Sequence, residues 1–433
     1  MTCVEMTSRD WHVRMAGLLG AYYNPQTDAP LPDAADQNLR DPIFLQGLSH
    51  FTIAHKPFEN FITRLRHALL LAGLSDGLAE AVACYAFNTE YILDVTPAET
   101  ALLGKLHNDK AALLACYAPL HVRDDAAEIR KILGDTVLAR QQIDQPLALE
   151  KRRAGIESVT DIGAGVSLLV RAQYEESPYP RWRDAPKPSF DADIQKRLPP
   201  QPSILIAGCG TGQETAQLAL ALPEAEILAV DLSRASLAYA MEQAERLGIR
   251  NVTFRQGDIL RLGTLAQRFD YISSQGVLHH MEDPLAGWHI LAGLLKPQGV
   301  LSLGLYSEIG RRHIVATHKA IAQHGFASTP EGIRNFRRRA NEILPENVVK
   351  ELQSPNDYYS LSMCRDLLFH VQEHRFDIPR IAAAIKTLGL SFLKFNSPFT
   401  PPAGDTLLHW HAHEEANPLI FRNMYKFWCA KGL

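Results

Sequence analysis

The segment ILIAGCGTGQ, residues 204–213, decides the fold of this chain. Apolar residues lead into glycines at 208, 210 and 212, and a stretch with a helical pattern follows. Glycine tolerates positive φ and leaves the backbone bare, so that a ligand can approach it closely. The segment therefore predicts a strand, a glycine-rich turn and a helix, with the turn at the carboxyl end of the strand, where parallel sheets bind ligands.

Further strand-like runs follow this segment and alternate with helical patterns. Their ranges are 226–231, 251–258, 270–278 and 299–306. The helix expected over 234–248 has Ser233 as its N-cap and Gly248 at its end. Alternation at this spacing predicts an α/β fold, a Rossmann-like parallel sheet with helices on both faces.

The rest of the chain predicts an all-α N-terminal domain. Residues 40–150 have apolar residues at helical spacing, whereas 175–202 is rich in proline and aromatic residues and is expected to be an extended connector. A second glycine turn, DIGAGV at 161–166, lacks a preceding apolar strand and is interpreted as a turn into a helix. The predicted domains are a helical N-terminal domain at 1–150, a connector and lid at 151–202, and a sheet domain at 203–433 with a helical insertion at about 308–385.

Composition narrows the class of protein. The chain has 433 residues, 46% of them hydrophobic and 21% charged, which is typical of a globular protein of two domains. The net charge of −4 gives no electrostatic reason to expect nucleic acid as a partner. The six cysteines include no CxxC pair, the N-terminus MTCVEMTSRDWHVRM lacks a secretory apolar core, and no apolar run could span a membrane. We therefore expect a cytoplasmic protein, and the oligomeric state stays open.

Two carboxylates narrow the ligand class. The spacing is GxGxG with glutamine at 213, whereas nicotinamide sites prefer GxGxxG. Asp231 ends the second strand 19 residues after Gly212 and could accept hydrogen bonds from a ribose diol. Asp258 ends the third strand, where it could accept a hydrogen bond from an adenine amino group.

Two more segments follow along the chain, the fourth-strand segment QGVLHHMEDP (275–284) and the turn KPQG (296–299). Together and in this order, the elements resemble the class I S-adenosylmethionine-dependent methyltransferases. The resemblance implies S-adenosyl-L-methionine as cofactor. It also implies that residues 208–212 face the methionine part, Asp231 holds the ribose, Asp258 frames the adenine and Gln275 lies near the sulfonium. The cofactor-binding residues so predicted are Tyr174, Gly208, Cys209, Gly210, Gly212, Asp231, Leu232, Asp258, Ile259 and Gln275.

Other stretches are similar to bacterial methyltransferases often attached to tetratricopeptide repeats. They are 171–182, 358–381 and 423–428, and the segment 40–70 resembles the helical region that precedes the catalytic domain in those proteins. The repeats themselves are absent from this sequence. The resemblance implies no particular methyl acceptor.

Histidines and a connector segment are candidates for the acceptor side. His279 and His280 follow the fourth strand, and an imidazole there could act as a general base because its pKa is near neutrality. The alternative is that one packs structurally and the other meets solvent. Tyr174, Tyr179, Arg181 and Trp182 could fold over the cofactor, or form a surface connector in which Trp182 covers a helix.

The sequence HVQEH at 370–374 matches the HxxEH pattern of zinc proteases if it is helical, but no third ligand is identifiable. We predict no metal, and a polar cluster in which Arg365, His370, Glu373 and His374 contact the substrate. Ordinary helix packing and a zinc hydrolase are the alternatives. The run Arg334 and Arg337–Arg339 is typical of a solvated helix face, and could instead attract an acidic acceptor.

Together these features predict an enzyme that transfers a methyl group from S-adenosylmethionine to a small-molecule or peptide acceptor. A catalytically silent cofactor-binding adaptor is the alternative from a different class. Methyl release as S-adenosylhomocysteine in a cell extract separates the two.

Overall fold

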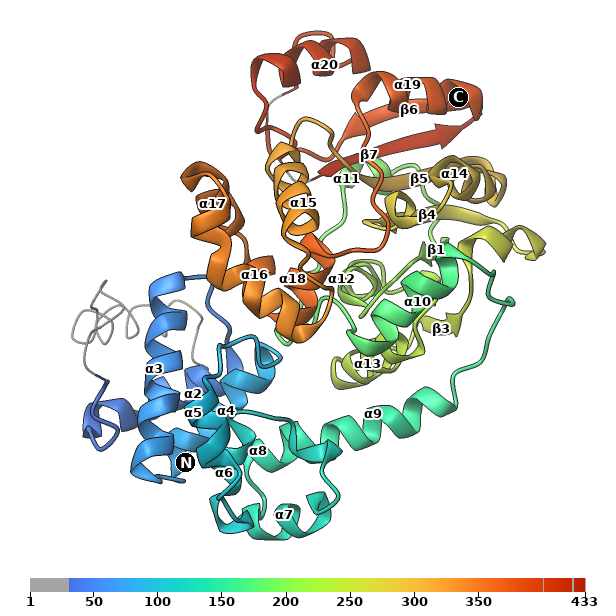
Figure 1. The fold of residues 1–433 in the computed structure, drawn as a ribbon. Helices are drawn as coiled ribbons and strands as arrows, with labels where there is room; N and C mark the ends of the chain where they lie inside the picture. The colour runs from blue at the N-terminus through green and yellow to red at the C-terminus, as the bar shows by residue number, and fades with distance from the viewer. Residues whose placement is uncertain (1–30, 400, 423, 433) are drawn as a thin grey trace. The chain divides into compact units, whose positions relative to one another are not determined.

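The chain forms two compact units (Figure 1). Residues 31–399, 401–422 and 424–432 are described in the computed structural model. The helical unit comprises the chain up to Ala148 together with Thr317–Phe369, and the sheet unit comprises Leu149–Ala316 and His370–Leu433. The structure thus groups most of the predicted insertion with the N-terminal helices. The N-terminal sequence on which we predicted the lack of a secretory signal lies outside the described residues.

The helical unit consists mostly of short helices, and side chains cap the starts of several of them. Asp41 and Asp76 accept backbone N–H groups at the starts of α2 and α4, and Thr96 forms a capping box with Glu99 at α5. Such caps satisfy N–H groups that the first turn leaves unpaired. The elements are η1 (Gln37–Arg40), α2 (Pro42–His50), α3 (Lys56–Ala72), α4 (Gly77–Asn88), α5 (Pro97–Leu103), η2 (Asn108–Lys110), α6 (Ala111–Ala115), η3 (Leu120–Val122), α7 (Ala126–Leu133), α8 (Val137–Ala139), η4 (Arg140–Asp144), α16 (Pro330–Ile343), α17 (Glu346–Leu352), η7 (Asn356–Tyr358) and α18 (Leu361–Leu368).

Two of the three boundaries between the units fall within helices, in α9 (Gln145–Ala154) and α15 (Arg312–His324). Residues 31–148 hold helices and no strand, which confirms the predicted helical N-terminal region. Across the described part of the chain, none of the helices combines the length and the apolar character that crossing a bilayer requires.

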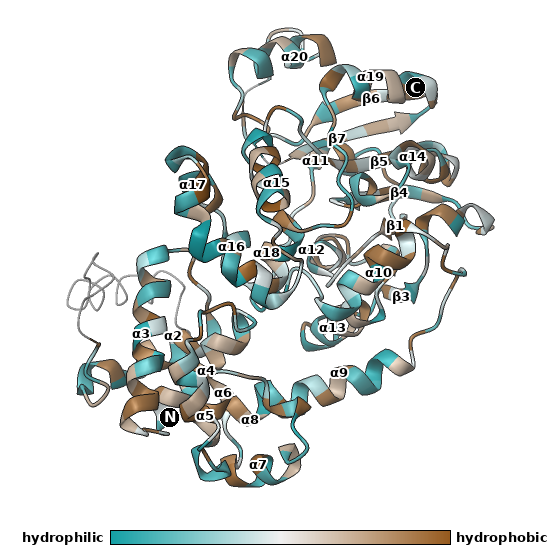
Figure 2. Ribbon diagram, in the orientation of Figure 1, coloured by the Kyte–Doolittle hydropathy of each residue, from teal (hydrophilic) through white to brown (hydrophobic). Residues whose placement is uncertain are grey.

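The arginine run lies on α16, which is largely hydrophilic in Figure 2. Arg334 donates two hydrogen bonds to the Tyr91 carbonyl, and Arg337 forms a buried ion pair with Glu59 at 2.5 Å. The expectation of a solvated face is therefore wrong for these two residues. Long-range partners in the N-terminal helices explain the difference, because a single-sequence charge pattern does not reveal them.

The sheet unit contains a seven-stranded sheet in the order β3-β2-β1-β4-β5-β7-β6. Its strands are β1 (Ser203–Ala207), β2 (Glu226–Asp231), β3 (Val252–Gln256), β4 (Phe269–Gln275), β5 (Leu295–Tyr306), β6 (Leu390–Phe395) and β7 (Met424–Lys431). The first five pair in parallel, as expected, but β7 runs antiparallel to both β5 and β6. The sheet is therefore mixed, because β7 returns between two strands that run the other way.

Helices cover both faces of this sheet (Figure 1). Along β1, Leu205 and Ala207 pack into one core with α14 and α19, whereas Ile204 and Ile206 pack into the other with α12 and α13. This alternation buries both faces of the central strands, as a parallel sheet requires. The helical elements are α10 (Val166–Glu176), α11 (Ala192–Gln195), α12 (Gln213–Ala221), α13 (Arg234–Arg246), η5 (Ile259–Thr264), η6 (Leu278–His280), α14 (Pro284–Gly293), α19 (Ile378–Thr387) and α20 (Leu407–Ala416).

The order in which the strands are added to the sheet reverses between β1 and β4: β2 and β3 lie on the β1 side, and β5 lies on the β4 side. In an open parallel sheet such a reversal leaves a crevice beyond the carboxyl ends of the strands, and ligands bind there. The turn 208–212 follows β1, and the fourth-strand segment follows β4. The candidate site therefore lies at this edge of the sheet unit.

Candidate cofactor and acceptor site

The glycine-rich turn has the conformation that only glycine adopts without strain. Gly208, Gly210 and Gly212 have φ of +79°, +52° and +82°. A Cβ atom at Gly208 would lie 2.5 Å from Val277 Cγ2, and one at Gly212 would lie 2.7 Å from Ala240 Cβ. Positions 208 and 212 of this turn therefore have no space for a side chain. The adjacent Cys209 is buried, and burial raises the pKa of its thiol well above the usual value.

Asp231 ends β2 directly beside this turn. Its carboxylate accepts hydrogen bonds from the backbone N–H groups of Gly210 at 2.8 Å and Ser233 at 2.9 Å. Burial raises the pKa of Asp231 to about 6, although these hydrogen bonds oppose the shift. The carbonyl of the next residue, Leu232, accepts a hydrogen bond from Gln256 at 2.9 Å.

Asp258 is almost fully buried and lies two residues after the end of β3, where it caps η5, rather than at the end of the strand as expected. Its Oδ2 accepts a hydrogen bond from the backbone N–H of Gly163 at 3.0 Å, and its own N–H donates to Thr160 Oγ1 at 2.8 Å. Ile259 follows it as the buried first residue of η5. The turn at 161–166 leads into α10, as predicted, but its position beside Asp258 was missed because no local signal links residues 95 apart.

Gln275 is the last residue of β4, and one of the two polar atoms of its side-chain amide forms a hydrogen bond. Its Nε2 donates to Ser302 Oγ at 2.9 Å, whereas its Oε1 is buried and has no hydrogen-bond partner among the described residues. A Cβ atom at Gly304 would lie 2.6 Å from that oxygen, so glycine is required at this point of β5. An unpaired acceptor at a buried position is costly, and therefore indicates a group that is bound there.

These features fit S-adenosylmethionine. The turn at 208–212 has no side chain at its three glycines, Asp231 offers acceptor oxygens at a strand end, and Gln275 Oε1 is an unpaired acceptor suited to a cationic group. The residues that would hold the cofactor are those predicted from the sequence, and Asp258 supplies a second carboxylate one strand further along the sheet. Which of them contact it stays a prediction.

The segment 174–182, called the strap below, crosses the glycine-rich turn. Trp182 is 6% exposed, and its Nε1 donates to the Thr211 carbonyl at 2.8 Å, while Thr211 Oγ1 donates to the carbonyl of Pro180. Tyr179 is half-buried and Arg181 is exposed. Trp182 also packs against Ala216 of α12 and Tyr239 of α13. The structure thus gives Trp182 the covering role of the alternative interpretation.

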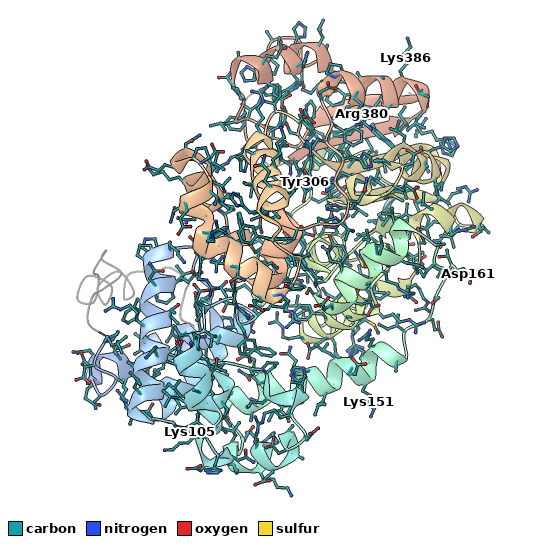
Figure 3. All side chains as sticks on the ribbon, viewed as in Figure 1. Lys105, Lys151, Asp161, Tyr306, Arg380 and Lys386 are labelled. Carbon is teal, nitrogen blue, oxygen red and sulfur yellow. The ribbon has the colours of Figure 1, made fainter. Side chains whose placement is uncertain are left out.

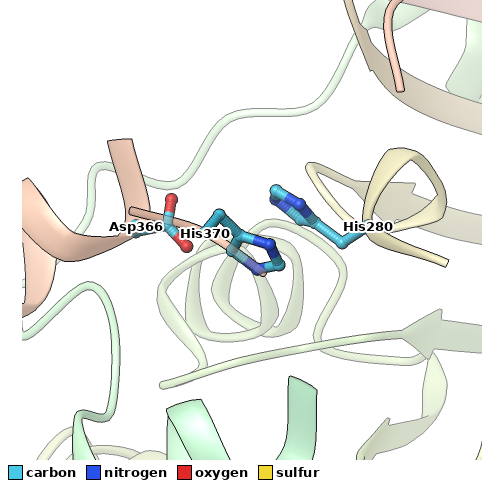
Figure 4. A group of neighbouring side chains, drawn as sticks. All are labelled: His280, Asp366 and His370. Atoms are coloured by element: carbon cyan, nitrogen blue, oxygen red, sulfur yellow. The ribbon is translucent and has the colours of Figure 1, made fainter. Parts of the chain in front are cut away.

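His279 and His280 lie in η6, close after the end of β4. His279 is fully buried and stacks on Tyr306 at a ring distance of 3.6 Å; Figure 3 labels Tyr306. His280 stacks on His370 at 3.6 Å, and Figure 4 shows these two rings next to each other; Asp366, also drawn, belongs to α18 of the helical unit. Burial lowers the pKa of both His279 and His280 well below the usual value.

Residues 370–376, called the 372 loop below, are not helical. The His374 N–H donates to the His279 carbonyl at 2.7 Å, and the Phe376 N–H donates to the Tyr306 carbonyl at 2.9 Å. The expectation of a helix here is wrong, because the backbone pairs instead with the end of β5 through the bridge between Ser307 and Phe376. His370 and His374 therefore do not share a helix face.

Among the described residues, His370, Glu373 and His374 do not form the helical arrangement that the zinc-hydrolase alternative requires. Glu373 forms a buried ion pair with Arg311 at 2.7 Å, and His374 Nε2 lies 2.9 Å from Gln372 Nε2. Arg365 lies on α18 of the helical unit, where its Nε donates to Ser328 Oγ at 3.2 Å. Of the predicted substrate residues, those of the 372 loop thus lie beside the predicted catalytic histidines. Arg311, Tyr306 and Gln372 are additional residues that the sequence did not single out.

The chain is similar to known proteins over part of its length. Residues 202–362 match the protein family described as a methyltransferase domain. An uncharacterized protein of Synechococcus sp. is 33% identical over 257 residues, which cover 53% of this chain and 60% of that protein. Trans-aconitate 2-methyltransferase of Deinococcus radiodurans is 34% identical over 148 residues, which cover 33% of this chain and 52% of that protein. The structure of PKMT2 from Rickettsia typhi, 16% identical, has a TM-score of 0.46 over 58% of this chain and 54% of its own.

The chain contains a class I methyltransferase domain, and S-adenosylmethionine is the cofactor of this class. The family match and the topology of the sheet confirm these two predictions. The chain spans only 60% and 52% of the length of the two curated relatives.

Proposed function

We propose that this protein transfers a methyl group from S-adenosylmethionine to a small-molecule or peptide acceptor. The observation that carries the proposal is the bare glycine turn hydrogen-bonded to Asp231 at the switch point of the sheet. Relatives of both kinds occur: a trans-aconitate 2-methyltransferase and a release factor glutamine methyltransferase. They leave both acceptor classes open for this chain.

Bound S-adenosylmethionine supplies an electrophilic methyl group on a sulfonium that leaves as a neutral thioether. The protein therefore has to align the acceptor and exclude water. In this proposal Asp231 holds the ribose, Asp258 orients the adenine, and Gln275 Oε1 accepts from the methionine part. His279 and His280 border the acceptor, together with the 372 loop.

The proposal also includes the cellular compartment of the protein and the class of its partner. The five cysteines in the described residues are free and buried, which supports a reducing cytoplasmic location. The net charge of −4 supports a partner other than nucleic acid.

Cofactor titration and label transfer together test the proposal. Calorimetry with S-adenosylmethionine should give one site per chain, and Asp231→Asn should weaken binding. Asp193→Asn is the matched control, because Asp193 is an exposed carboxylate on α11 paired with lysines. Tritiated methyl groups should then pass from the cofactor into either the small-molecule or the protein fraction of a lysate. Binding without any transfer would favour the silent adaptor, and absence of binding would refute the site.

A further inference from the structure

One residue of the 372 loop sets the hydrogen bonding of two histidines. His280 Nδ1 lies 2.8 Å from the Gln372 carbonyl, and the Gln372 N–H donates to His370 Nδ1 at 3.1 Å. A carbonyl only accepts, so Nδ1 of His280 carries the proton and its Nε2 keeps the lone pair. By the same logic His370 is protonated at Nε2, which lies 3.3 Å from Tyr174 Oη.

The loop that presents Gln372 is itself fixed at several points. Its neighbour Glu373 pairs with Arg311 through two hydrogen bonds, at 2.7 and 3.2 Å, and both side chains are about 5% exposed. Arg311 also lies over the Tyr306 ring at 3.6 Å. A bidentate buried pair restricts the loop more strongly than a surface pair does. The carbonyl of Gln372 is therefore held in place before any acceptor binds.

His279 is buried and stacked like His280, but its ring makes different contacts. It is fully buried, it stacks on Tyr306, and neither of its ring nitrogens has a hydrogen-bond partner within the described residues. Its ring therefore lies against the aromatic face of Tyr306.

We propose that His280 Nε2 removes a proton from the acceptor atom, and that Gln372 is the positioning residue that fixes the required tautomer. The acceptor is then a hydroxyl or amine that carries a proton at neutral pH, rather than a carboxylate or a carbanion. This inference rests on the proposed methyl transfer and assigns separate roles to the two histidines.

The step balances without any further reagent. The acceptor O–H or N–H bond breaks and its proton goes to His280 Nε2, while the acceptor electron pair forms a bond to the methyl carbon. The sulfur–methyl bond breaks and the sulfur keeps its electron pair as a neutral thioether. The imidazolium then loses its proton to water. Burial, His370, His279 and Arg311 outweigh the hydrogen bond to the Gln372 carbonyl and lower the pKa of His280. They therefore favour the neutral imidazole, which is the form that accepts a proton.

Kinetics of full-length variants test the base. With tritiated S-adenosylmethionine and a fractionated lysate as the acceptor source, His280→Gln should slow label transfer by about 10²–10⁴-fold while the cofactor Kd stays within a factor of three. His289→Gln, at an exposed histidine of α14, is the matched control and should leave label transfer unchanged. At saturating S-adenosylmethionine, the wild-type rate should rise with pH through the lowered pKa of His280, and this rise should be absent in His280→Gln. Equal rates of label transfer by the wild type and His280→Gln would overturn the inference. Failure of the wild-type protein to bind the cofactor would instead refute the proposed function.

Nitrogen NMR tests the positioning role without an acceptor. In the ¹⁵N-histidine-labelled full chain, His280 should show a protonated Nδ1 and an unprotonated Nε2, with assignment by comparison with His280→Gln. Gln372→Ala keeps both backbone groups and should leave the His280 tautomer signals unchanged. Gln372→Pro removes the N–H and should change the His370 signals while the His280 tautomer persists. A His280 protonated at Nε2 in the wild type would overturn the assignment.

Discussion

Tyr174 Oη lies 3.3 Å from His370 Nε2, although 196 residues separate them in the chain. The same tyrosine accepts a hydrogen bond from Ser233 Oγ at its backbone carbonyl, at 3.0 Å. Ser233 in turn donates its N–H to Asp231 at 2.9 Å. The strap thus connects the carboxylate proposed to hold the ribose with the histidine that stacks on His280. The proposed cofactor and acceptor sides of the site therefore share a continuous set of contacts within the sheet unit.

Tyr174→Phe separates the two ends of this connection. The variant keeps the backbone carbonyl that binds Ser233 but loses the hydroxyl that meets His370. We expect a roughly fivefold slower methyl transfer, since a hydrogen bond of this kind contributes about 1 kcal/mol. The cofactor affinity should stay unchanged in a calorimetric titration. A large loss of cofactor affinity would instead favour the sequence-based prediction that this tyrosine binds the cofactor directly.

Cofactor binding should depend on pH through Asp231. Its pKa is raised by burial to about 6, so the carboxylate becomes protonated in the free protein below that pH. A ribose diol needs an acceptor, and the protonated form offers fewer acceptor lone pairs. Affinity for S-adenosylmethionine should therefore be constant above pH 7 and fall as the pH decreases from 7 to 5, as measured by calorimetry in matched buffers.

Asp231→Asn should flatten this pH dependence and weaken binding at pH 7.5 by about 10–100-fold, because a hydrogen bond to a charged group contributes about 1.5–3 kcal/mol. The contribution of Asp231 to folding stability has the opposite pH dependence. A raised folded-state pKa stabilises the folded protein at pH values below the unfolded pKa, and this stabilisation is lost as the pH rises through about 6. Unfolding of the cofactor-free variant should thus show no pH dependence from this group. A wild-type affinity that rises on acidification would contradict the assignment.

Gly208→Ala should prevent cofactor binding through a clash rather than through backbone strain alone. The new Cβ would meet Val277 Cγ2 at 2.5 Å. Gly248→Ala is the matched control, because Gly248 has φ of +68° with no atom within 4 Å of its Cβ position. The control should lose only the ~1–2 kcal/mol of a left-handed residue and bind the cofactor normally. Urea unfolding and calorimetry compare the two; equal losses would show that strain dominates.

The fold around β1 and β2 could be predicted because its signals are local. The range 226–231 is the strand β2 as the structure has it, and Ser233 caps α13 by accepting from the Ser236 N–H. Apolar runs, a glycine turn and a cap residue each depend on neighbours within a few positions. The cofactor residues predicted at strand ends follow from the same local pattern and from the rule for parallel sheets.

The 372 loop could not be predicted because its conformation depends on distant partners. Its sequence allows a helix with His370 and His374 one turn apart, and nothing in it disfavours that structure. The deciding contacts are the backbone pairing of Phe376 with Tyr306 and the ion pair between Glu373 and Arg311. Both partners lie more than 60 residues upstream, so only the folded chain reveals them.

The arginine run on α16 gives the same lesson and a prediction for the helical unit. Arg337 is 8% exposed and pairs with Glu59 of α3, 278 residues away. Burial opposes ionisation of Glu59, but Arg337 and Lys56 outweigh it and lower the pKa of its carboxyl. The ion pair therefore stabilises the folded state above the unfolded pKa, and this contribution is lost as the pH falls through the lowered folded value.

Glu59→Gln should destabilise the helical unit strongly, because it leaves a buried guanidinium without its counter-charge. We expect a loss of about 3–5 kcal/mol in the free energy of unfolding, measured by urea denaturation at pH 7. Asp94→Asn is the matched control. It removes the partner of Arg338, whose side chain is 47% exposed, and should cost about 0–1 kcal/mol. If the two variants lost similar amounts, the buried pair would not hold α3 to α16, and the arginines would act as the solvated face that their sequence pattern suggests.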